Sequence, residues 1–459
     1  MSSSQAAAIS ARLDRLPSSR HVWTIILLLS LGGCFEFYDL FYTAYVAPGL
    51  IGAGIFKAKS GLLGSYGFAS FPAALFAGLF VGTIAFGFVA DRFGRRAVFV
   101  YSLLWYSVAT AIMAFRHTWV GVDLWRFIAG IGIGVELITI DTYVAELIPK
   151  YLRGRAFAFS QMIMFCVVPI VAFLAWMLVP TKPLGLDGWR WVVLIGSLGA
   201  IAVWWIRLGV PESPRWLIQH GRTAEAEAIV AEMEAAVRAE GVEMPPPKSA
   251  PEEDASPGKW SEMWLPEYRG RTIMLSAYNL LQTVGYYGFA VWVTQFLANK
   301  GITVTKSLEY SFIIAIANPV GPLLGIFIAD KMERKWQIVS AALAIAVFGL
   351  LFSVQTAAWL VILFGALITL SNNWLSFAFH AYQPELFPTR VRARAVGFVY
   401  SWSRLSVVFS SFIIGGILIN SGVTAVFIFI ALCMVAVAFI IGAFGPRTRN
   451  LALEEISKA

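Results

Sequence analysis

Charged residues are scarce in this chain. Only 14% of its 459 residues are Asp, Glu, Lys or Arg, whereas an ordinary soluble domain has about 25%. Hydrophobic residues make up 58% of the sequence, and the mean hydropathy is +0.72. A water-exposed surface needs more charge than this, so the composition excludes a soluble globular protein.

Cysteine and histidine are also rare, with three and four residues respectively. Cys34, Cys166 and Cys433 lie in separate apolar runs, which excludes a disulfide framework and metal-ligand spacing. The motifs H-E-x-x-H, G-x-S-x-G and G-x-x-x-x-G-K are absent from the sequence. We therefore expect no metal site, no cofactor and no enzymatic activity.

Long apolar runs are what the chain has instead. About twelve runs of about 20 residues recur between residues 22 and 444, and each can cross a bilayer core of roughly 30 Å. They form two groups of six, at 22–208 and 271–444. The sequence predicts an all-α polytopic membrane protein built from two six-helix halves, with its first apolar run retained and not cleaved.

Three polar segments, 1–21, 209–270 and 445–459, flank and join the two halves. In the central segment, residues 222–240 alternate charge signs and have helix-forming composition, which predicts a helix. The proline-rich run that follows it predicts a flexible linker.

The net charge of +8 is gathered in alternate short loops and not in one nucleic-acid-binding patch. These basic clusters comprise Arg92, Arg95, Arg96, Lys150, Arg153, Arg155, Lys331, Arg334, Lys335, Arg390, Arg392 and Arg394. Lys and Arg are enriched on the cytoplasmic side of membrane proteins. We therefore expect both termini and the 209–270 segment to be cytosolic, in a multi-pass protein of the inner (cytoplasmic) membrane with no nucleic-acid partner.

The two halves repeat each other. GFVADRFGRR at 87–96 is echoed by GIFIADKMERK at 325–335, and AELIPKYLRGR at 145–155 by PELFPTRVRAR at 384–394. Such matching of two halves indicates an internal repeat, which is typical of transporters.

Three motifs carry a resemblance to a known family. G-x-x-x-D-R-x-G-R-R occurs at 87–96, R-x-x-x-G-x-G-x-G at 126–134 and PESPRWL at 211–217. With these motifs the chain resembles major facilitator superfamily transporters of the sugar-porter and organic-ion branches. The resemblance implies that a monomer moves a small molecule by alternating access. Where sugar porters end in PETKG, this chain has PRTRN at 446–450, a departure from that branch.

Gly130 and Gly134 of the second motif share a helix face with Arg126, and such spacing predicts close packing with a neighbouring helix. For the charged residues at the helix ends, the resemblance implies intracellular gating. These residues are Asp91, Arg92, Arg95, Arg96, Glu146, Arg153, Glu212, Arg215, Asp330 and Glu385. The alternative is that they set topology and have solvated partners, since exposed pairs contribute about 0–1 kcal/mol.

Charges inside apolar runs are costly and mark functional sites. Asp39 lies nine residues before Pro48, about 13 Å along a helix, and Arg126 lies seven residues after Trp119, about 10 Å. Both therefore sit at similar depth and can form a pair that separates when the carboxylate is protonated. The resemblance implies proton coupling here, with Glu36 and Glu136 as further carboxylates. The alternative is a static ion pair.

Arg404 lies twelve residues beyond Arg392, about 18 Å along its helix and near the bilayer midplane. At that depth a guanidinium needs an anion, either a substrate carboxylate or a protein carboxylate such as Glu136. Aligned on PELFP, Arg404 and His380 fall where sugar porters carry aromatic residues of the substrate pocket.

The resemblance adds Gln161, Gln282, Tyr286 and Tyr287 as pocket candidates, although helix packing explains each of them about equally well. Aromatic walls with one deep cation suit a planar carboxylate better than a polyol. The sequence therefore predicts proton-coupled uptake of a small organic anion, an aromatic or heterocyclic monocarboxylate. The alternative is a proton-coupled sugar or polyol symporter.

Overall fold

The computed structural model describes residues 3–57, 67–86, 89–208, 210–247, 260–328, 332–387 and 389–448. Within these ranges every regular element is a helix. The apolar runs of the sequence explain why: lipid offers backbone groups no hydrogen-bond partners, and a helix satisfies them within its own segment.

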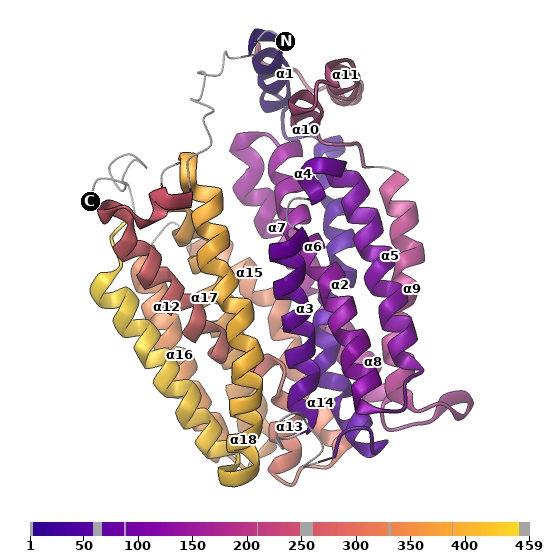
Figure 1. The fold of residues 1–459 in the computed structure, drawn as a ribbon, viewed down its shortest axis with the longest axis vertical. Coiled ribbons are helices and arrows are strands. Elements are labelled where there is room, and N and C mark those ends of the chain that lie inside the picture. The colour runs from indigo at the N-terminus through magenta and orange to yellow at the C-terminus, as the bar shows by residue number, and fades with distance from the viewer. Residues whose placement is uncertain are drawn as a thin grey trace.

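The first half of the chain, coloured indigo to magenta in Figure 1, forms one bundle of long helices. Its elements are α2 (Arg20–Gly52), α3 (Ser70–Phe86), α4 (Val89–Phe93), α5 (Arg95–Ala114), α6 (Trp119–Leu147), α7 (Arg153–Phe165), α8 (Val167–Leu178) and α9 (Gly188–Leu208).

The second half, coloured orange to yellow, forms a second bundle beside the first (Figure 1). Its elements are α12 (Pro266–Ala290), α13 (Val293–Asn299), α14 (Val304–Ala315), α15 (Ala317–Ile328), α16 (Arg334–Val354), α17 (Ala358–Glu385) and α18 (Thr389–Phe444). Gly422 turns α18 back on itself with φ 77° and ψ −176°, a conformation that only glycine adopts readily.

Eight stretches among the described residues are long and apolar enough to cross a membrane. One of them, Arg394–Phe444, folds back at Gly422 and so crosses twice. The helices α6, α9 and α12 have comparable lengths of 29, 21 and 25 residues, which gives twelve passes in two groups of six. The predicted polytopic fold is confirmed.

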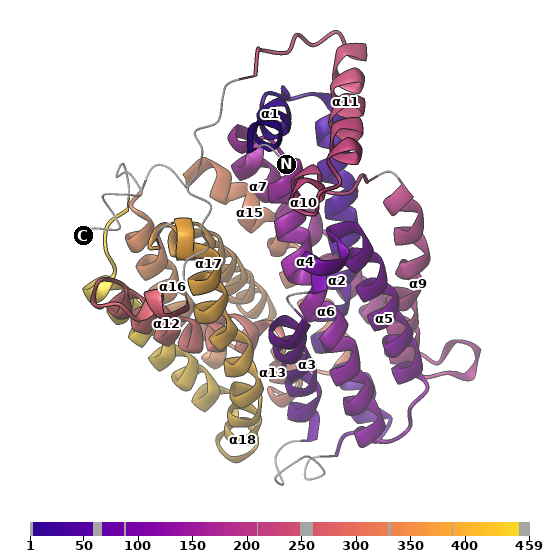
Figure 2. The same ribbon diagram turned by 45° about the horizontal axis from the view of Figure 1, so that its top comes forward.

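The two bundles lie closest at the end of the molecule that carries α13, which we call the α13 end (Figure 2). Aromatic pairs join them there: Phe68 contacts Trp292 at 5.5 Å and Trp176 stacks on Phe312 at 5.9 Å between ring centroids. The Thr294 hydroxyl also donates to the Ala44 carbonyl. The opposite end carries α1 (Ser3–Asp14), α10 (Pro214–Gln219) and α11 (Thr223–Ala239), and we call it the α10 end.

Glycines let α3 and α6 approach closely. A Cβ at Gly130 would lie 2.4 Å from the Leu75 carbonyl oxygen, and one at Gly134 would lie 2.5 Å from the Leu79 carbonyl oxygen. Any side chain at these positions would force the helices apart, so the predicted close packing is confirmed. The contact fixes the depth and rotation of Arg126, one turn before Gly130.

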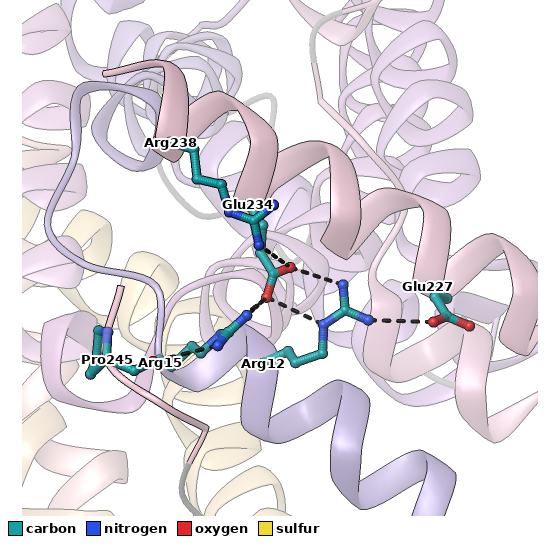
Figure 3. Close-up of polar contacts among 6 residues, drawn as sticks. All are labelled: Arg12, Arg15, Glu227, Glu234, Arg238 and Pro245. Carbon is teal, nitrogen blue, oxygen red and sulfur yellow. Dashed lines mark hydrogen bonds and ion pairs between the residues drawn. The ribbon is translucent and has the colours of Figure 1, made fainter. Parts of the chain in front are cut away.

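At the α10 end, α1 docks on α11 through the carboxylate of Glu234 (Figure 3). Arg12 donates to both Glu234 oxygens, at 3.2 and 2.9 Å, and Arg15 donates to one of them. The Glu234 side chain is only 4% exposed. The sequence predicted a helix at 222–240 and the structure has α11 there, but the α1 contact was not foreseen.

Burial alone would raise the pKa of Glu234, but the hydrogen bonds from Arg12 and Arg15 outweigh it and the pKa is lowered. A carboxylate with a lowered pKa stabilises the contact at neutral pH. The stabilisation is lost as the pH falls through that lowered pKa. The C-terminal end of α11 is tied down as well, since the Glu240 carboxylate accepts from the backbone N–H groups of Arg20 and His21 at the start of α2.

We expect Glu234→Gln to loosen α1. Loss of the charge should cost about 1 kcal/mol, which raises the undocked population about fivefold. Trypsin cleaves after Arg12 and Arg15, so the initial rate of cleavage there reports undocking. Glu232→Gln, which changes an exposed carboxylate on the same helix, is the matched control. Equal cleavage rates for wild type and Glu234→Gln would contradict this role.

Candidate functional site

The deepest ion pair of the described residues joins Asp39 on α2 to Arg126 on α6. Arg126 Nη1 donates to both Asp39 carboxylate oxygens, at 3.2 and 3.1 Å, and Nη2 donates to the Asp39 carbonyl at 2.7 Å. The Arg126 side chain is 0% exposed and that of Asp39 is 5% exposed. The structure therefore brings together the two residues that helix depth predicted to be level, although their role in proton coupling remains a prediction.

Neutral side chains complete the surroundings of Arg126. Its guanidinium donates to the hydroxyls of Tyr42 and Thr43 and lies 4.4 Å from the centroid of the Tyr42 ring and 5.0 Å from that of Phe71. The other member of the ion pair, Asp39, accepts a hydrogen bond at Oδ1 from the Thr110 hydroxyl of α5 at 3.3 Å. In this low-dielectric setting the cation and the carboxylate stabilise each other, because water cannot screen them.

Two more carboxylates lie on the α10 side of this pair. Glu36 is one turn from Asp39 on α2, and Glu136 is ten residues from Arg126 on α6; both are buried. Glu136 Oε2 lies 3.4 Å from the Ser102 hydroxyl of α5. Both carboxylates, together with Asp39, interact electrostatically with the buried phenol of Tyr106 on α5. Helix α5 thus contacts two carboxylates, Asp39 through Thr110 and Glu136 through Ser102.

Arg404 of α18 faces the first half from the second. Its guanidinium donates to the Tyr287 hydroxyl at 3.4 Å and the Tyr400 hydroxyl at 3.5 Å, and it lies 5.0 Å from the centroid of the Tyr400 ring. The side chain is buried, at 6% exposure for the residue. Within the described part of the chain Arg404 has no ion pair, and the carboxylate that interacts with it electrostatically is Glu36.

Glu136 was named as a protein carboxylate for Arg404, the alternative to a substrate carboxylate, and that pairing stays a prediction. Among the contacts described, Glu136 lies near Ser102 of α5, and Glu36 is close enough for its charge to act on Arg404.

His380 of α17 lies beside this arginine site. Its ring contacts the Tyr400 ring at 5.5 Å, and its Nδ1 lies 2.7 Å from the Ser376 carbonyl oxygen. His380 is exposed, whereas its neighbours Ala378 and Phe379 are buried. His380 is therefore accessible although it lies within the long helix α17, as expected of a residue that lines a pocket.

Tyr286 and Tyr287 are adjacent on α12 but contact different neighbours. Tyr287 packs edge-on to Phe76 of the first half at 4.6 Å, whereas Tyr286 donates to Asn373 Oδ1 at 3.4 Å. Gln282 is buried on the same helix, and Gln161 on α7 is half-buried.

Sequence reasoning missed an amide cluster next to Tyr286. Asn373 donates to the Asn318 carbonyl at 3.1 Å, and the three residues line a cavity with Asn372 and Thr369. The pair Asn372–Asn373 inside an apolar run was the available signal. These amides can donate and accept hydrogen bonds without carrying charge.

The predicted gating residues gather at the α10 end in separate clusters. Arg95 donates to the Glu146 carboxylate at 2.9 Å, and the Glu212 carboxylate accepts from the backbone N–H groups of Arg95 and Arg96 at the start of α5. In the second half Arg334 pairs with Glu385. Each of these contacts lies within one half.

The remaining gating candidates are placed as follows. Arg215 pairs with Asp14 of α1 at 2.8 Å, and Arg153 Nε donates to the Ile148 carbonyl. Arg92 is exposed and lies over the ring of Phe93. Asp330 and the side chain of Asp91 lie outside the described part of the structure.

The geometry at Gly94 explains why the first motif has glycine directly before its last two arginines. Its φ is 97°, and a Cβ there would lie 2.5 Å from Glu212 Oε2. Glycine thus lets PESPRWL reach back and cap α5, which links two motifs that are far apart in sequence.

The comparisons with known proteins agree with this geometry. The family described as "Sugar (and other) transporter" matches residues 25–459. The putative metabolite transport protein YyaJ of Bacillus subtilis is 31% identical over 95% of both chains. The niacin transporter NiaP of Acinetobacter baylyi is 28% identical, over 97% of this chain and 99% of its own. The inward-open xylose transporter XylE of E. coli has a TM-score of 0.75 at 21% identity, over 95% of this chain and 99% of its own.

We expect Gly94→Ala to destabilise the protein by about 1–3 kcal/mol, since a positive φ with a β-carbon is strained and the cap is displaced. The measurement is thermal unfolding in detergent. Gly154→Ala is the matched control, because a Cβ at Gly154 meets nothing within 4 Å on helix α7. A Gly94→Ala protein as stable as Gly154→Ala would show that the cap does not depend on glycine.

Proposed function

The chain belongs to the sugar (and other) transporter family, and from that premise we propose that it couples proton entry to the uptake of a small organic anion. The substrate is an aromatic or heterocyclic monocarboxylate. It is carried by alternating access: the two halves expose one central site to each side of the membrane in turn.

The observation that carries the proposal is the state of Arg404. A buried guanidinium whose described polar contacts are two phenols at 3.4 and 3.5 Å lacks a strong acceptor. Substrate carboxylate would supply one, through a bidentate charge-assisted contact that is stronger than a bond to a neutral phenol.

The groups around Arg404 favour a planar substrate. The guanidinium contacts the Tyr287 hydroxyl and the Tyr400 ring, and His380 packs on Tyr400. An aromatic or heterocyclic substrate ring could stack against these rings. The resemblance to a niacin transporter points the same way, because niacin is a pyridine monocarboxylate.

The proposed coupling runs through Glu36, Asp39 and Arg126. Glu36 interacts with Arg404, so a substrate carboxylate that takes its place removes its positive partner and favours its protonation. Asp39 pairs with Arg126, and a proton on Asp39 would release that arginine. Glu136, which lies closer to the α10 end, is the fourth residue that we assign to proton coupling.

We further propose that the α10 end is cytosolic, as the basic clusters require, so that both termini face the cytosol of a cell with this protein in its inner membrane. The gating residues then form and break contacts as the inner side opens. The proposed units are 1–21, 22–208, 209–270, 271–444 and 445–459, and one chain is the working transporter.

A sugar or polyol is the second candidate, and the amide cluster favours it. Asn318, Asn372 and Asn373 supply the uncharged donors and acceptors that hydroxyl groups need. The likeness of fold to a D-xylose-proton symporter, with a TM-score of 0.73, is compatible with either substrate class.

We expect Arg404→Ala to abolish carboxylate binding. Loss of a desolvated charge partner costs about 2–5 kcal/mol, which weakens affinity by well over tenfold, and Arg404→Lys should weaken it less. The measurement is a binding titration of purified protein with nicotinate. Nicotinamide, which has the same ring without the carboxylate, and xylose are titrated in parallel.

Two results would contradict the organic-anion proposal. One is unchanged nicotinate affinity in folded Arg404→Ala. The other is wild-type binding of xylose with no binding of any monocarboxylate of a panel of benzoate, nicotinate and other ring carboxylates, which would establish the second candidate.

A further inference from the structure

Helix α5 presents a row of hydroxyl groups toward Asp39 and Glu136 of the first half. Ser102, Tyr106 and Thr110 are spaced four residues apart, so they share one face of the helix. All three are buried, with 7, 2 and 2% of the residue exposed. From Ser102 to Thr110 the row spans about 12 Å along the helix axis.

The two ends of the row touch two different carboxylates. Thr110 donates to Asp39 Oδ1 at 3.3 Å, at the level of the Arg126 ion pair. Ser102 lies 3.4 Å from Glu136 Oε2, on the side toward the α10 end. The Ser102 hydroxyl can donate to the Val98 carbonyl at 2.7 Å or to Glu136 Oε2, so rotation of this hydroxyl turns its proton from the backbone to the carboxylate.

Tyr106 lies between these ends, and its phenol interacts electrostatically with Glu136, Glu36 and Asp39. Among the residues that the structure describes, its hydroxyl has no hydrogen-bond partner, although it is buried. An unpartnered buried hydroxyl costs about 1–3 kcal/mol. Packing alone would be served equally well by phenylalanine, so the hydroxyl calls for a role in another step of the cycle.

The other charged groups that face the row are few. Arg126 of α6 lies at the Asp39 level, and Arg190 of α9 donates to the Ala114 and Arg116 carbonyls beyond Thr110. Neither contacts Tyr106 or Ser102 among the hydrogen bonds described. The groups that can give a proton to the row or take one from it are therefore the carboxylates at its two ends.

We propose that Thr110, Tyr106 and Ser102 form a hydroxyl relay that carries a proton from Asp39 to Glu136. Each hydroxyl oxygen accepts a proton on one side and releases its own on the other, and a bridging water carries the proton to and from Tyr106. Every hydroxyl is restored after the transfer. The net change is one proton lost from Asp39, which then pairs again with Arg126, and one gained by Glu136.

This inference rests on the proposed proton coupling and assigns its path. Glu136 lies about 15 Å nearer the α10 end than Arg126, at ten residues along α6. The relay therefore moves the proton toward the side on which we place the cytosol. Residues of α5 that no motif marks thus become part of the transport cycle.

The test uses proteoliposomes and labelled nicotinate as the probe. Accumulation driven by an imposed pH gradient requires proton release in every cycle. Counterflow exchange does not, because the loaded transporter returns with its proton still bound. Tyr106→Phe keeps the ring and removes the unpartnered hydroxyl, and Thr110→Val is its near-isosteric companion. Ser107→Ala is the matched control, since Ser107 is buried on the next face of α5 with an equally unpartnered hydroxyl.

We expect Tyr106→Phe and Thr110→Val to slow driven accumulation by about tenfold or more, the usual loss when a proton transfer loses its positioned group. The rate of counterflow exchange in these variants should stay within about twofold of wild type. In Ser107→Ala, the rates of accumulation and of exchange should both stay within that range. Wild-type accumulation by Tyr106→Phe would overturn the relay, and so would an equal loss of accumulation and exchange. If wild-type protein accumulates no member of the carboxylate panel under the pH gradient, the proposed function itself fails and the relay falls with it.

Discussion

A guanidinium buried in the first half constrains everything around it. Arg126 has no exposed surface, and a cation there is tolerable only with a carboxylate and enough acceptors at fixed positions. Four helices meet that demand: α2 brings Asp39, Tyr42 and Thr43, α3 brings the ring of Phe71, α5 brings Thr110, and α6 carries the arginine itself. Removing Asp39 alone would leave the charge uncompensated, at a cost of about 3–5 kcal/mol.

A second buried cation gives the molecule its proposed way of linking substrate to protons. Arg404 lies in the other half, and Glu36 connects it electrostatically to the carboxylates around Tyr106. Arg126 has the Asp39 carboxylate, whereas the described hydrogen bonds of Arg404 go to two phenols, and the Glu36 carboxylate acts on it electrostatically. This inequality is the basis for proposing that Arg404 binds an anionic substrate and Asp39 a proton.

Helix geometry explains which parts of the site the sequence could predict. The fixed rise per residue placed Asp39 and Arg126 at one level, and two charges at one level inside a bilayer were expected to meet. The twelve passes and the close contact of α3 with α6 follow equally from apolar runs and glycine spacing. These properties depend only on positions along the chain.

Rotation of the helices about their axes could not be predicted in this way. It decides that Arg404 lies against Tyr287 and Tyr400, and that Thr110 and Ser102 of one helix reach Asp39 and Glu136. It is set by packing among all neighbours, as at Gly130 against Leu75, and a single sequence contains no measure of it. The docking of α1 on Glu234 was missed for the same reason, since the partners are more than 200 residues apart.

The central claim is that the substrate enters together with a proton that buried carboxylates bind and release. Measuring proton flux tests this claim most directly. Proteoliposomes with a pH-sensitive dye inside and no ion gradient should acidify internally when nicotinate is added outside, if wild-type protein is present. Vesicles with Asp39→Asn should still exchange labelled nicotinate but show no acidification, because the amide cannot bind and release the proton. Nicotinate entry by wild-type protein without acidification, or full acidification with Asp39→Asn, would contradict the account.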